Sequence, residues 1–347
     1  MPERWSMETR IVAENEKGAW EQYVRQHPGS IAWQSYDWFT VVRKHYAVDF
    51  IPLAVMNGSG ITGVLPLYRI GSSQGKNMLI SVPYAVAGGI LADNEDADEA
   101  LVGKAIALAA EYGSRGITLK QYKRKIAGSF RIDDGFYNRE LDISRDLTMV
   151  WNGLDDRNRQ KIGEAQKYPL VLDYPTRDMN AFYKLLFRHH HRSGVPCVSK
   201  KWIEDLIAFK LYTAALLTLN GRPVAGTLVK EFKDTVSFPF SCIASADGQH
   251  YLYAYDLYWK LISRFAARGT RIYHSGRIPH NNEVEEYRLG WNGTQYGYYY
   301  QYYPAGDAIR QESNKKGRKR QLFASLWRQV PESIAARLGP SIVKRFP

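Results

Sequence analysis

The feature that most constrains this chain is an internal duplication. Residues 51–67 and 214–230 both have the pattern of an apolar strand, an Asn-Gly turn and a second strand, and the turns Asn57-Gly58 and Asn220-Gly221 lie 163 residues apart. Asn-Gly accepts the positive φ angles of a tight hairpin turn. Because 347 residues are enough for two domains of ordinary size, a repeat at this spacing predicts two similar domains.

Further matches keep the same order along the chain. A Ser-x-x-Trp segment ends at Trp38 in the first half and at Trp202 in the second. Each half then has a helical pattern that ends at a glycine, Gly116 or Gly269, shortly before a strand. Each half is therefore expected to fold as helix, loop, hairpin, helix and strand. This order predicts an α/β (α+β layered) fold in which helices cover a hairpin-rich sheet.

The net charge of +12 is concentrated at the end of the chain. Residues 314–347 hold nine Lys and Arg residues and one acid, so this stretch carries +8 of the total. We therefore expect a first domain at 1–150, a second domain at 151–310, and a basic C-terminal tail at 311–347.

The tail has an amphipathic pattern. Five basic residues fall within residues 315–320, and apolar residues at helical spacing follow them: Leu322, Phe323, Leu326, Trp327 and Val330. A polybasic run beside such a helix is typical of a protein that lies on an anionic membrane surface. Two alternatives stay open: the helix packs on the body of the protein, or the basic run binds tRNA.

Composition excludes several classes of protein. Apolar residues make up 45% of the chain and charged residues 24%, which is the profile of a globular protein. No uncharged apolar run approaches the ~20 residues of a membrane span, and the N-terminal residues lack a signal-peptide pattern. Two cysteines are too few for a disulfide framework or a cysteine zinc site. We expect a cytoplasmic protein without a metal, held at the inner face of the membrane if the tail docks there.

Three segments of the second half carry a family resemblance. They are Arg192-Ser193-Gly194-Val195-Pro196, Ser275-Gly276-Arg277 and Tyr287-Arg288-Leu289-Gly290-Trp291-Asn292. The first resembles an Arg-x-Gly-x-Pro motif, the second a Gly-Arg strand end, and the third a Phe-Lys-x-x-Trp-Gly motif with Tyr, Arg and Asn as departures. Together with the duplicated order, they resemble the tandem GNAT-like acyltransferase domains of the FemAB/CelD type over residues 15–305. The tail around Leu326-Trp327-Arg328 is similar to members found with exosortase-linked exopolysaccharide systems.

The resemblance implies an acyltransferase that moves an acyl or aminoacyl group to an amine of a cell-envelope or exopolysaccharide precursor. It implies acyl-CoA or aminoacyl-tRNA as the donor, with no tightly bound cofactor and no DNA partner. Two alternatives are an acetyl-CoA-dependent sugar N-acetyltransferase and a non-catalytic glycan- or partner-binding protein of the same fold.

The resemblance places the catalytic cation at Arg288, where the family has a Lys that supports the developing oxyanion or the phosphates of the donor's acceptor arm. Arginine keeps the positive charge that stabilises an oxyanion but cannot give up its proton at neutral pH. The structural alternative is a surface arginine paired with Glu285 or Glu286.

Six further residues are candidates for substrate binding. Arg192 and Arg277 suit a phosphate or carboxylate, because guanidinium groups bind these anions bidentately. The resemblance adds Tyr287 in the second half, and it adds Gln34, Trp38 and Arg43 in the segment that faces the acceptor in the family. The alternative for Trp38 and its counterpart Trp202 is a role as core anchors.

Three other patterns have structural interpretations. Residues 160–165 match the pyrophosphate loop of acetyl-CoA enzymes, but no strand precedes them, so we expect a helix. His189, His190 and His191 are consecutive, so one helix cannot aim them at one metal ion, and we expect a partly exposed helix end with protonated histidine. The tyrosine-rich residues 296–303 predict a late strand.

Overall fold

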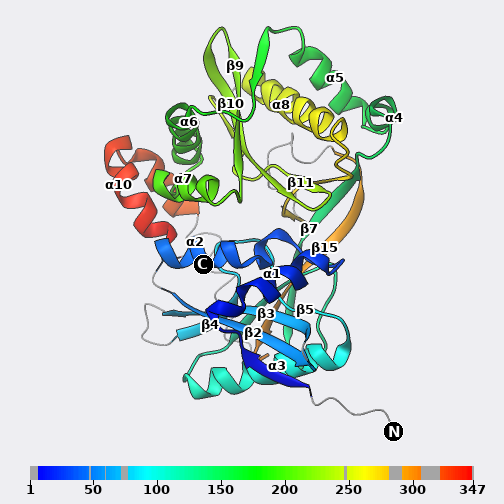
Figure 1. Ribbon diagram of the computed structural model, residues 1–347. Coiled ribbons are helices and arrows are strands. Elements are labelled where there is room, and N and C mark those ends of the chain that lie inside the picture. Colours follow the sequence, from blue (N-terminus) through cyan, green and yellow to red (C-terminus); the bar gives the residue numbers. More distant parts are fainter. Residues whose placement is uncertain are drawn as a thin grey trace. The chain divides into compact units, whose positions relative to one another are not determined.

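The computed structural model describes residues 7–46, 48–58, 60–71, 77–245, 248–280, 291–305 and 321–345 (Figure 1). Its contacts divide the chain into two compact units. Unit 1 contains the described residues of Met1–Phe136 and Gly297–Ala308, and unit 2 contains those of Tyr137–Tyr296 and Ile309–Phe346. The boundaries of these units differ from those of the domains expected from the duplication, 1–150 and 151–310. The expected domains describe the repeat in the sequence and stay a prediction.

Unit 1 is a mixed sheet with helices on both faces. Its elements are β1 (Glu8–Ile11), η1 (Glu14–Glu16), α1 (Lys17–Gln26), η2 (Ala32–Gln34), α2 (Tyr36–His45), β2 (Asp49–Asn57), β3 (Gly60–Gly71), β4 (Asn77–Ser81), β5 (Leu91–Ala92), α3 (Glu95–Glu111), β6 (Ile117–Tyr122) and the start of β7 (Arg131–Asp142). The strands run in the order β1-β2-β3-β4-β6-β15, where β15 is Thr294–Tyr303. Neighbouring strands are antiparallel except for the parallel pair β4 and β6.

Unit 2 repeats this plan. Its elements are α4 (Leu147–Asn152), α5 (Asp156–Ala165), β8 (Leu170–Asp173), α6 (Met179–Arg192), α7 (Lys200–Ala208), β9 (Thr213–Leu219), β10 (Arg222–Phe232), β11 (Thr235–Ser237), β12 (Cys242–Ile243), α8 (Gly248–Ala266), β13 (Ile272–His274), β14 (Ile278–Pro279) and α10 (Glu332–Val343). The strands run in the order β8-β9-β10-β11-β13-β7, and again one neighbouring pair, β11 and β13, is parallel.

The two halves of the sequence exchange their last strands. In unit 1, β6 pairs with β15, which lies near residue 300, through the register Lys120 to Tyr300. In unit 2, β13 pairs with β7, which comes from the first half of the chain, through the register Tyr273 to Leu141. Each sheet is therefore completed by a strand from the other half of the sequence.

Apolar side chains fill both faces of each sheet. In unit 1, Leu101 and Leu108 of α3 pack with Leu53 and Leu65 of the sheet. On the opposite face, Trp20 of α1 meets Phe39 of α2 edge to face, with 5.7 Å between ring centres. In unit 2, α8 packs against β9 and β10 through a cluster that includes Leu257 and Leu261, while α6 lies on the other side of these strands (Figure 1).

The repeated Ser-x-x-Trp segment is a helix N-cap in both halves. The hydroxyl of Ser35 accepts a hydrogen bond from the backbone N–H of Trp38 at 3.4 Å. Ser199 accepts one from the N–H of Trp202 at 3.1 Å. Both tryptophans are 2% exposed, so the motif starts a helix and anchors it in the core.

The hairpin turns match the prediction in one half and differ by one residue in the other. Asn220 and Gly221 have φ angles of +51° and +75° between the paired residues Leu219 and Arg222, as a type I′ turn requires. In the first half, Asn57 still belongs to β2 and pairs with Gly60.

The glycines aligned from the two hairpins also face different helices. A Cβ on Gly63 would meet Ala97 and Leu101 of α3, but one on Gly226 would meet Phe182 of α6. The alignment based on the sequence is therefore off by one residue at this point.

The predicted glycine stop is also shifted in the first half. The helix α3 ends at Glu111, and the positive φ of +58° belongs to Gly113 rather than to Gly116. A Cβ on Gly116 would lie 2.2 Å from the carbonyl oxygen of Tyr303, so this glycine is required by the close approach of β15. Gly269 has a φ of +84° just after α8, as predicted.

The tail packs in part on unit 2. Residues 321–329 are helical and are followed by α10. Trp327 is 5% exposed, His191 donates a hydrogen bond to the carbonyl of Val330 at 2.8 Å, and Gly339 lies against the backbone of Cys197. The predicted apolar face is thus divided, because Leu322 and Leu326 stay exposed. The polybasic residues 315–320 lie outside the described residues.

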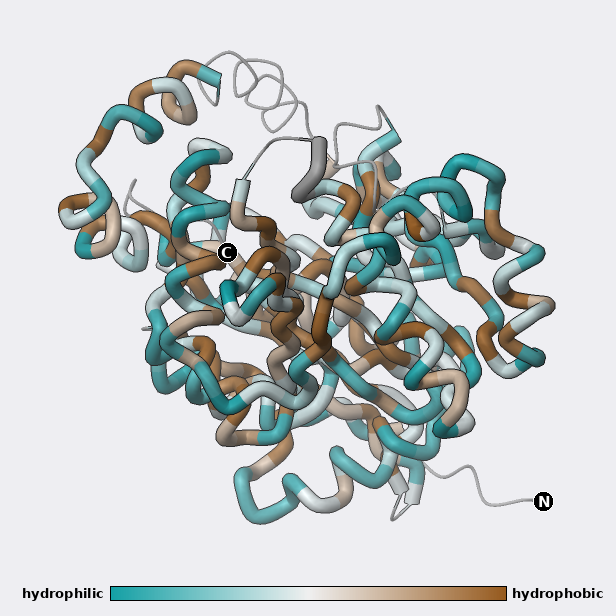
Figure 2. Tube along the Cα trace, turned by 90° about the horizontal axis from the view of Figure 1, so that it is seen from above, coloured by the Kyte–Doolittle hydropathy of each residue, from teal (hydrophilic) through white to brown (hydrophobic). Residues whose placement is uncertain are grey.

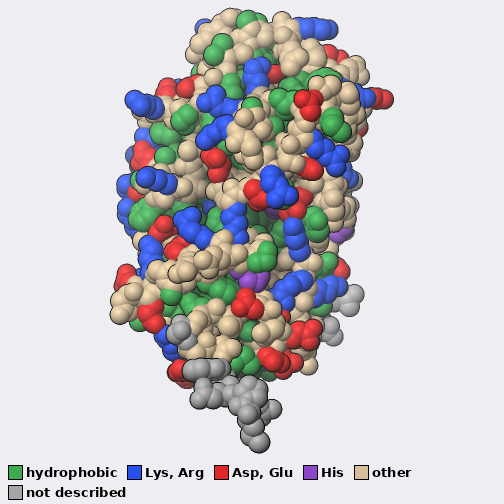
Figure 3. Space-filling model, turned by 45° about the vertical axis from the view of Figure 1, so that its right-hand side comes forward, with side chains coloured by type: hydrophobic (Ala, Val, Ile, Leu, Met, Phe, Trp, Pro, Cys, Tyr) green, Lys and Arg blue, Asp and Glu red, His purple; other side chains and the backbone are tan. Residues whose placement is uncertain are grey.

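Apolar and polar residues alternate along the helices (Figure 2). None of the described helices is long and apolar enough to cross a membrane. On the face in Figure 3, basic and acidic side chains are interspersed without a large area of one sign, which agrees with a body of nearly balanced charge.

Strand exchange predicts that the halves cannot fold alone. A fragment of residues 1–150 lacks β15 and leaves the edge of β6 unpaired, so we expect it to aggregate or to lack a cooperative unfolding transition. Co-expression with residues 151–347 should restore a soluble complex, because each fragment supplies the strand that the other needs. Size-exclusion chromatography and thermal circular dichroism measure both outcomes, and a monomeric 1–150 fragment that unfolds cooperatively would contradict the exchange.

Candidate functional site

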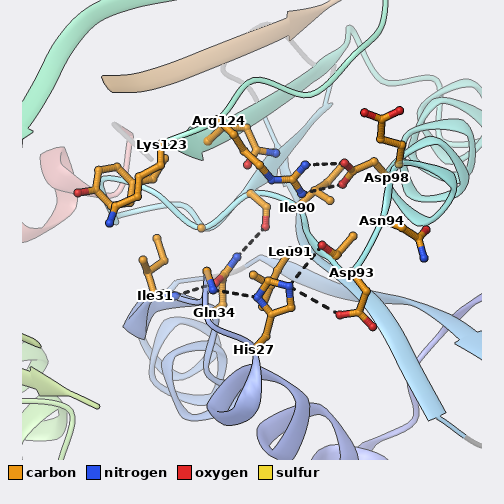
Figure 4. A pocket seen from close by; sticks show the side chains of 17 residues that line it. His27, Ile31, Gln34, Ile90, Leu91, Asp93, Asn94, Asp98, Lys123 and Arg124 are labelled. Atoms are coloured by element: carbon orange, nitrogen blue, oxygen red, sulfur yellow. Dashed lines mark hydrogen bonds and ion pairs between the residues drawn. The ribbon is translucent and has the colours of Figure 1, made fainter. Parts of the chain in front are cut away.

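A cavity of about 410 Å³ opens in unit 1 (Figure 4). Its wall comes from three places: the segment between α1 and α2, residues 88–95 with Asp98 at the start of α3, and residues 121–124 at the end of β6. The last two segments follow the parallel strands β4 and β6. The sheet topology therefore brings loops from distant parts of the sequence to one site.

Two glycines let the backbone form part of this wall. Gly88 has a φ of +142°, and a Cβ on Gly89 would lie 2.6 Å from the amide of Gln121. The N–H groups of both glycines donate to the carbonyl of Lys120, at 3.0 and 2.9 Å. A side chain at either position would displace the loop from β6.

The predicted substrate-binding residue Gln34 lies in this wall and is 3% exposed. Its Oε1 accepts from the N–H of Ile31 at 2.9 Å, and its Nε2 donates to the carbonyl of Gly89 at 3.1 Å. Both ends of the amide therefore hold the loops of the cavity in place.

His27 and Asp93 form a polar corner of the cavity (Figure 4). The N–H of Gly29 donates to Nδ1 of His27 at 3.0 Å, so Nε2 carries the proton of the neutral ring and faces the carbonyl of Ala92 at 3.3 Å. Asp93 lies 3.7 Å from the same Nε2 and 2.9 Å from the hydroxyl of Tyr23. Burial, and then the hydrogen bond to Asp93, raises the pKa of Tyr23 well above its usual value.

Asp98 and Arg124 form a bidentate ion pair at the other side of the cavity. The two N–O distances are 2.5 and 2.8 Å, and the Asp98 side chain is 10% exposed. Gln121, which is 2% exposed, has an Nε2 donor with no hydrogen-bond partner among the described residues. Among the described side chains that line the cavity, Gln121 thus offers a buried donor that no described group of the protein uses.

The charge of this cavity does not suit a diphosphate. The first turn of α3 contains Glu95, Asp96 and Asp98, and Asp93 precedes it. An anion is stabilised at a helix N-terminus by unpaired N–H groups, and carboxylates at the same place repel it. The residues of unit 1 therefore do not fit the diphosphate of coenzyme A at α3.

The first turn of α8, which occupies the place of α3 in unit 2, has no acidic residue. Two residues of α6 fix the strand that precedes it. Arg192 donates to the carbonyl oxygens of Ile243 and Ala244 at 2.7 and 2.9 Å, and Nδ1 of His189 accepts from the N–H of Ile243 at 3.4 Å. The guanidinium predicted to bind substrate thus binds the backbone at β12.

The expectation of a protonated histidine at the end of α6 is wrong for His189. This residue is 8% exposed, and burial, followed by the charge of Arg192, lowers its pKa to about 4. The helix end is covered here, so the neutral ring is favoured over the interaction of a cation with the helix dipole.

The other predicted residues lie apart from the cavity. Trp38 is a core residue, Arg43 is exposed on α2, and Arg277 is exposed next to β14. Arg288, Tyr287, Glu285 and Glu286 lie outside the described residues. Residues 160–165 are helical, as expected, within α5. The tyrosine-rich strand is β15, also as expected.

No sequence pattern singled out His27, Asp93, Asp98 or Arg124, which are scattered over about 100 positions. One signal was available for Asp98, because it lies on the same helix face as Leu101 and Ala105, where a carboxylate needs a partner. No pattern singled out Lys230 in unit 2, whose pKa is lowered to about 7 by burial and whose Nζ lies 4.4 Å from the ring centre of Tyr212. The described residues contain no group of three or more side chains arranged to bind a metal ion.

Two units with this repeated sheet, one parallel strand pair and helices on both faces define a tandem GNAT-fold protein. Among solved structures, FemX has this fold with a TM-score of 0.67 and 12% identity, and the match covers 85% of this chain and 97% of FemX. The C-terminal DUF2156 domain of a putative lysylphosphatidylglycerol synthetase from Agrobacterium fabrum has a TM-score of 0.61 and 11% identity, with 87% and 96% covered. No family model matches the chain, and no curated protein sequence matches it significantly.

A tandem GNAT protein from the clavulanic acid biosynthesis pathway is also similar, with a TM-score of 0.55, 12% identity, and 85% and 98% of the two chains covered. At these identities the likeness shows the fold. The predicted resemblance to FemAB-type proteins and the predicted duplicated GNAT-like layout are therefore confirmed.

The ion pair at the cavity should couple more strongly than an exposed one. Arg124→Met leaves the Asp98 carboxylate without its partner, so a double-mutant cycle with Asp98→Asn should give a coupling free energy of about 1 kcal/mol or more. The matched control is Arg69–Asp49, with 40% and 62% of the side chains exposed, where we expect a coupling of about 0.5 kcal/mol or less. Equal couplings from urea unfolding would contradict this ranking.

Buried neutral His189 should make stability depend on pH. Its folded pKa of about 4 lies below the usual value of about 6.5, so the unfolded chain binds the proton first as the pH falls. Above pH ~6.5 the ring is neutral in both states, so His189 takes nothing from the free energy of unfolding. Between there and pH ~4 the unfolded chain binds a proton that the folded chain does not, and the free energy of unfolding falls by roughly 2–3 kcal/mol. The free energy of unfolding should fall less over this range in His189→Gln than in the wild type. Parallel pH profiles of the two proteins would refute the assignment.

Proposed function

We propose that this protein transfers an acyl or aminoacyl group to an amine of a cell-envelope or exopolysaccharide precursor. The observation that carries the proposal is the match in fold to FemX over 85% of this chain, and to the domain of the putative lysylphosphatidylglycerol synthetase over 87% of it. A two-unit fold kept over that length supports a shared chemistry of group transfer.

In this proposal, unit 2 binds the donor and unit 1 binds the acceptor. An acyl-CoA or aminoacyl-tRNA donor carries phosphates, and the acidic start of α3 in unit 1 disfavours them. The donor is therefore assigned to unit 2, where Arg192 and His189 hold the strand before α8. The acceptor is assigned to the cavity of unit 1. There, Asp93 and Glu95 favour the cationic amine, and Gln121 offers a hydrogen-bond donor to a polar neighbour of the amine.

The reaction needs a free amine and a stabilised oxyanion. An amine bound as a cation first gives up one proton, and its nitrogen then attacks the carbonyl carbon of the donor, so that negative charge develops on the carbonyl oxygen. We assign stabilisation of this charge to Arg288, as the sequence motif implies. The intermediate collapses as the bond to the sulfur of coenzyme A or to the ribose oxygen of the tRNA breaks, and this leaving group takes up a proton. The nitrogen gives its second proton to a group other than Arg288, because the guanidinium already holds its own protons at neutral pH.

A donor assay separates this proposal from its alternatives. The protein is incubated with amine-bearing cell-wall and polysaccharide precursors and with either labelled acetyl-CoA or tRNA charged with labelled amino acids. Label transferred from either donor to an envelope precursor supports the proposal. Transfer from acetyl-CoA to simple amino sugars alone supports the sugar N-acetyltransferase, and glycan binding without transfer from any donor supports the non-catalytic protein.

Arg288→Ala should lower the rate of transfer by ~10²–10³, as expected when one group that stabilises an oxyanion is removed. Arg288→Lys keeps the positive charge and should retain more activity than the alanine variant. Initial rates and thermal melts of the three proteins measure the effect and check the fold. An alanine variant within a factor of about two of the wild type would rule out this role for Arg288.

A further inference from the structure

Exposed apolar side chains gather in the tail. Among the described residues, five of the eleven large exposed apolar side chains lie within residues 321–345: Leu322, Phe323, Leu326, Ile334 and Leu338. Large apolar side chains that remain in water together mark an interaction surface more often than single ones do.

These side chains form a repeated pattern. Leu322 and Leu326 are four residues apart on the first tail helix and are 63% and 57% exposed. Ile334 and Leu338 have the same spacing on α10 and are 47% and 49% exposed. Residues four apart share one face of a helix, so each helix presents an apolar pair.

The packing of the tail on unit 2 uses different residues. Trp327, Ala335 and Gly339 are buried, and each directly follows one of the exposed apolar residues. Gly194 of unit 2 lies so close to Ala324 that a Cβ would come within 2.6 Å of its carbonyl oxygen. One stripe of each tail helix thus attaches it to unit 2, and the neighbouring stripe is left for another partner.

The exposed charge of the tail is positive. Arg328, Arg337, Lys344 and Arg345 are exposed, and Glu332 is the one acid of residues 321–345. Glu332 lies 3.6 Å from Arg188, so its charge is already balanced within unit 2. The surface therefore combines apolar side chains with a net positive charge.

We propose that this tail surface, defined by the five exposed apolar residues and the four basic residues, lies on an anionic membrane. The lipid headgroups attract the basic side chains, and the apolar side chains enter the boundary with the acyl chains. A second copy of the chain would cover the apolar residues but would bring like charges together. An RNA would attract the basic residues and leave the leucines in water.

Liposome flotation of the full chain tests the proposal. The vesicles contain phosphatidylcholine alone or phosphatidylcholine mixed with phosphatidylglycerol, and we expect flotation with the anionic vesicles. Leu326→Glu/Leu338→Glu should reduce the bound fraction by roughly tenfold or more, since the substitutions remove apolar side chains from the lipid and add negative charge.

The matched control is Met149→Glu/Val171→Glu, which replaces two side chains of unit 2 that are 59% and 63% exposed but lie outside the tail. This control adds the same charge and should float like the wild type. Thermal melts of both variants check that the substitutions leave the fold intact. A second variant, Arg337→Gln/Arg345→Gln, should lose binding to the anionic vesicles while leaving the apolar pairs in place.

Three results would overturn the proposal: no flotation of the wild type, equal losses in the tail variant and the control, or equal binding to neutral and anionic vesicles. A dimer that the tail substitutions dissociate, without flotation, would instead identify an interface between copies. Because flotation measures lipid binding and not transfer, its outcome is independent of the proposed transferase activity.

Discussion

The structure depends on backbone hydrogen bonds between strands that are far apart in the sequence. The edge of β6 is covered by β15, and the edge of β13 is covered by β7. A sheet edge left open exposes unpaired N–H and C=O groups, which invite the wrong partner. The exchange removes two such edges at once. It also makes the stability of each unit depend on the other half of the chain, even though each unit has its own hydrophobic core.

The duplicated units keep the same sheet and differ at the start of one equivalent helix, α3 in unit 1 and α8 in unit 2. Both place a helix directly after a short strand beside the hairpin, β5 before α3 and β12 before α8. In unit 1 the helix begins with carboxylates, and the cavity beside it is bounded by the Asp98–Arg124 pair. In unit 2 the corresponding strand is held by Arg192 and His189. Two copies of one fold can thus carry different charge at equivalent places without a change in topology.

The sequence predicted the repeated elements because their signals are local. The matched Ser-x-x-Trp segments, the hairpin at Asn220-Gly221 and the strand of tyrosines depend on neighbours within a few residues. The register of the first hairpin was harder to predict. A shift of its turn by one residue points Gly63 toward α3 instead of α1, and the spacing of residues in the sequence did not reveal this shift. The exchange of β7 and β15 was not predicted, because no local pattern tells a strand which partner it will have.

The residues of the candidate site likewise divide into those with a local sequence signal and those that only the fold brings together. Gln34 was predicted to bind substrate from the family resemblance; it lies in the cavity wall, and its role there stays a prediction. His27, Asp93 and Arg124 come from three loops that only the sheet brings together, so their spacing in the sequence carries no signal. Arg192 shows the opposite case: its residue type suggested an anion, but two backbone carbonyls satisfy its guanidinium. A charged side chain alone did not reveal whether its partner belongs to a ligand or to the protein.

The exchanged strands also set an order of events during synthesis. The strand β6 ends at Tyr122, but its partner β15 ends at Tyr303, so the ribosome must add nearly the whole second half before unit 1 can close. At usual rates of translation this takes on the order of ten seconds or more. During that time the nascent first half carries an unpaired edge at β6 and an unmatched β7. The protein can complete both sheets only late, when nearly all of it has left the ribosome, and a chaperone that shields strand edges would act in this interval.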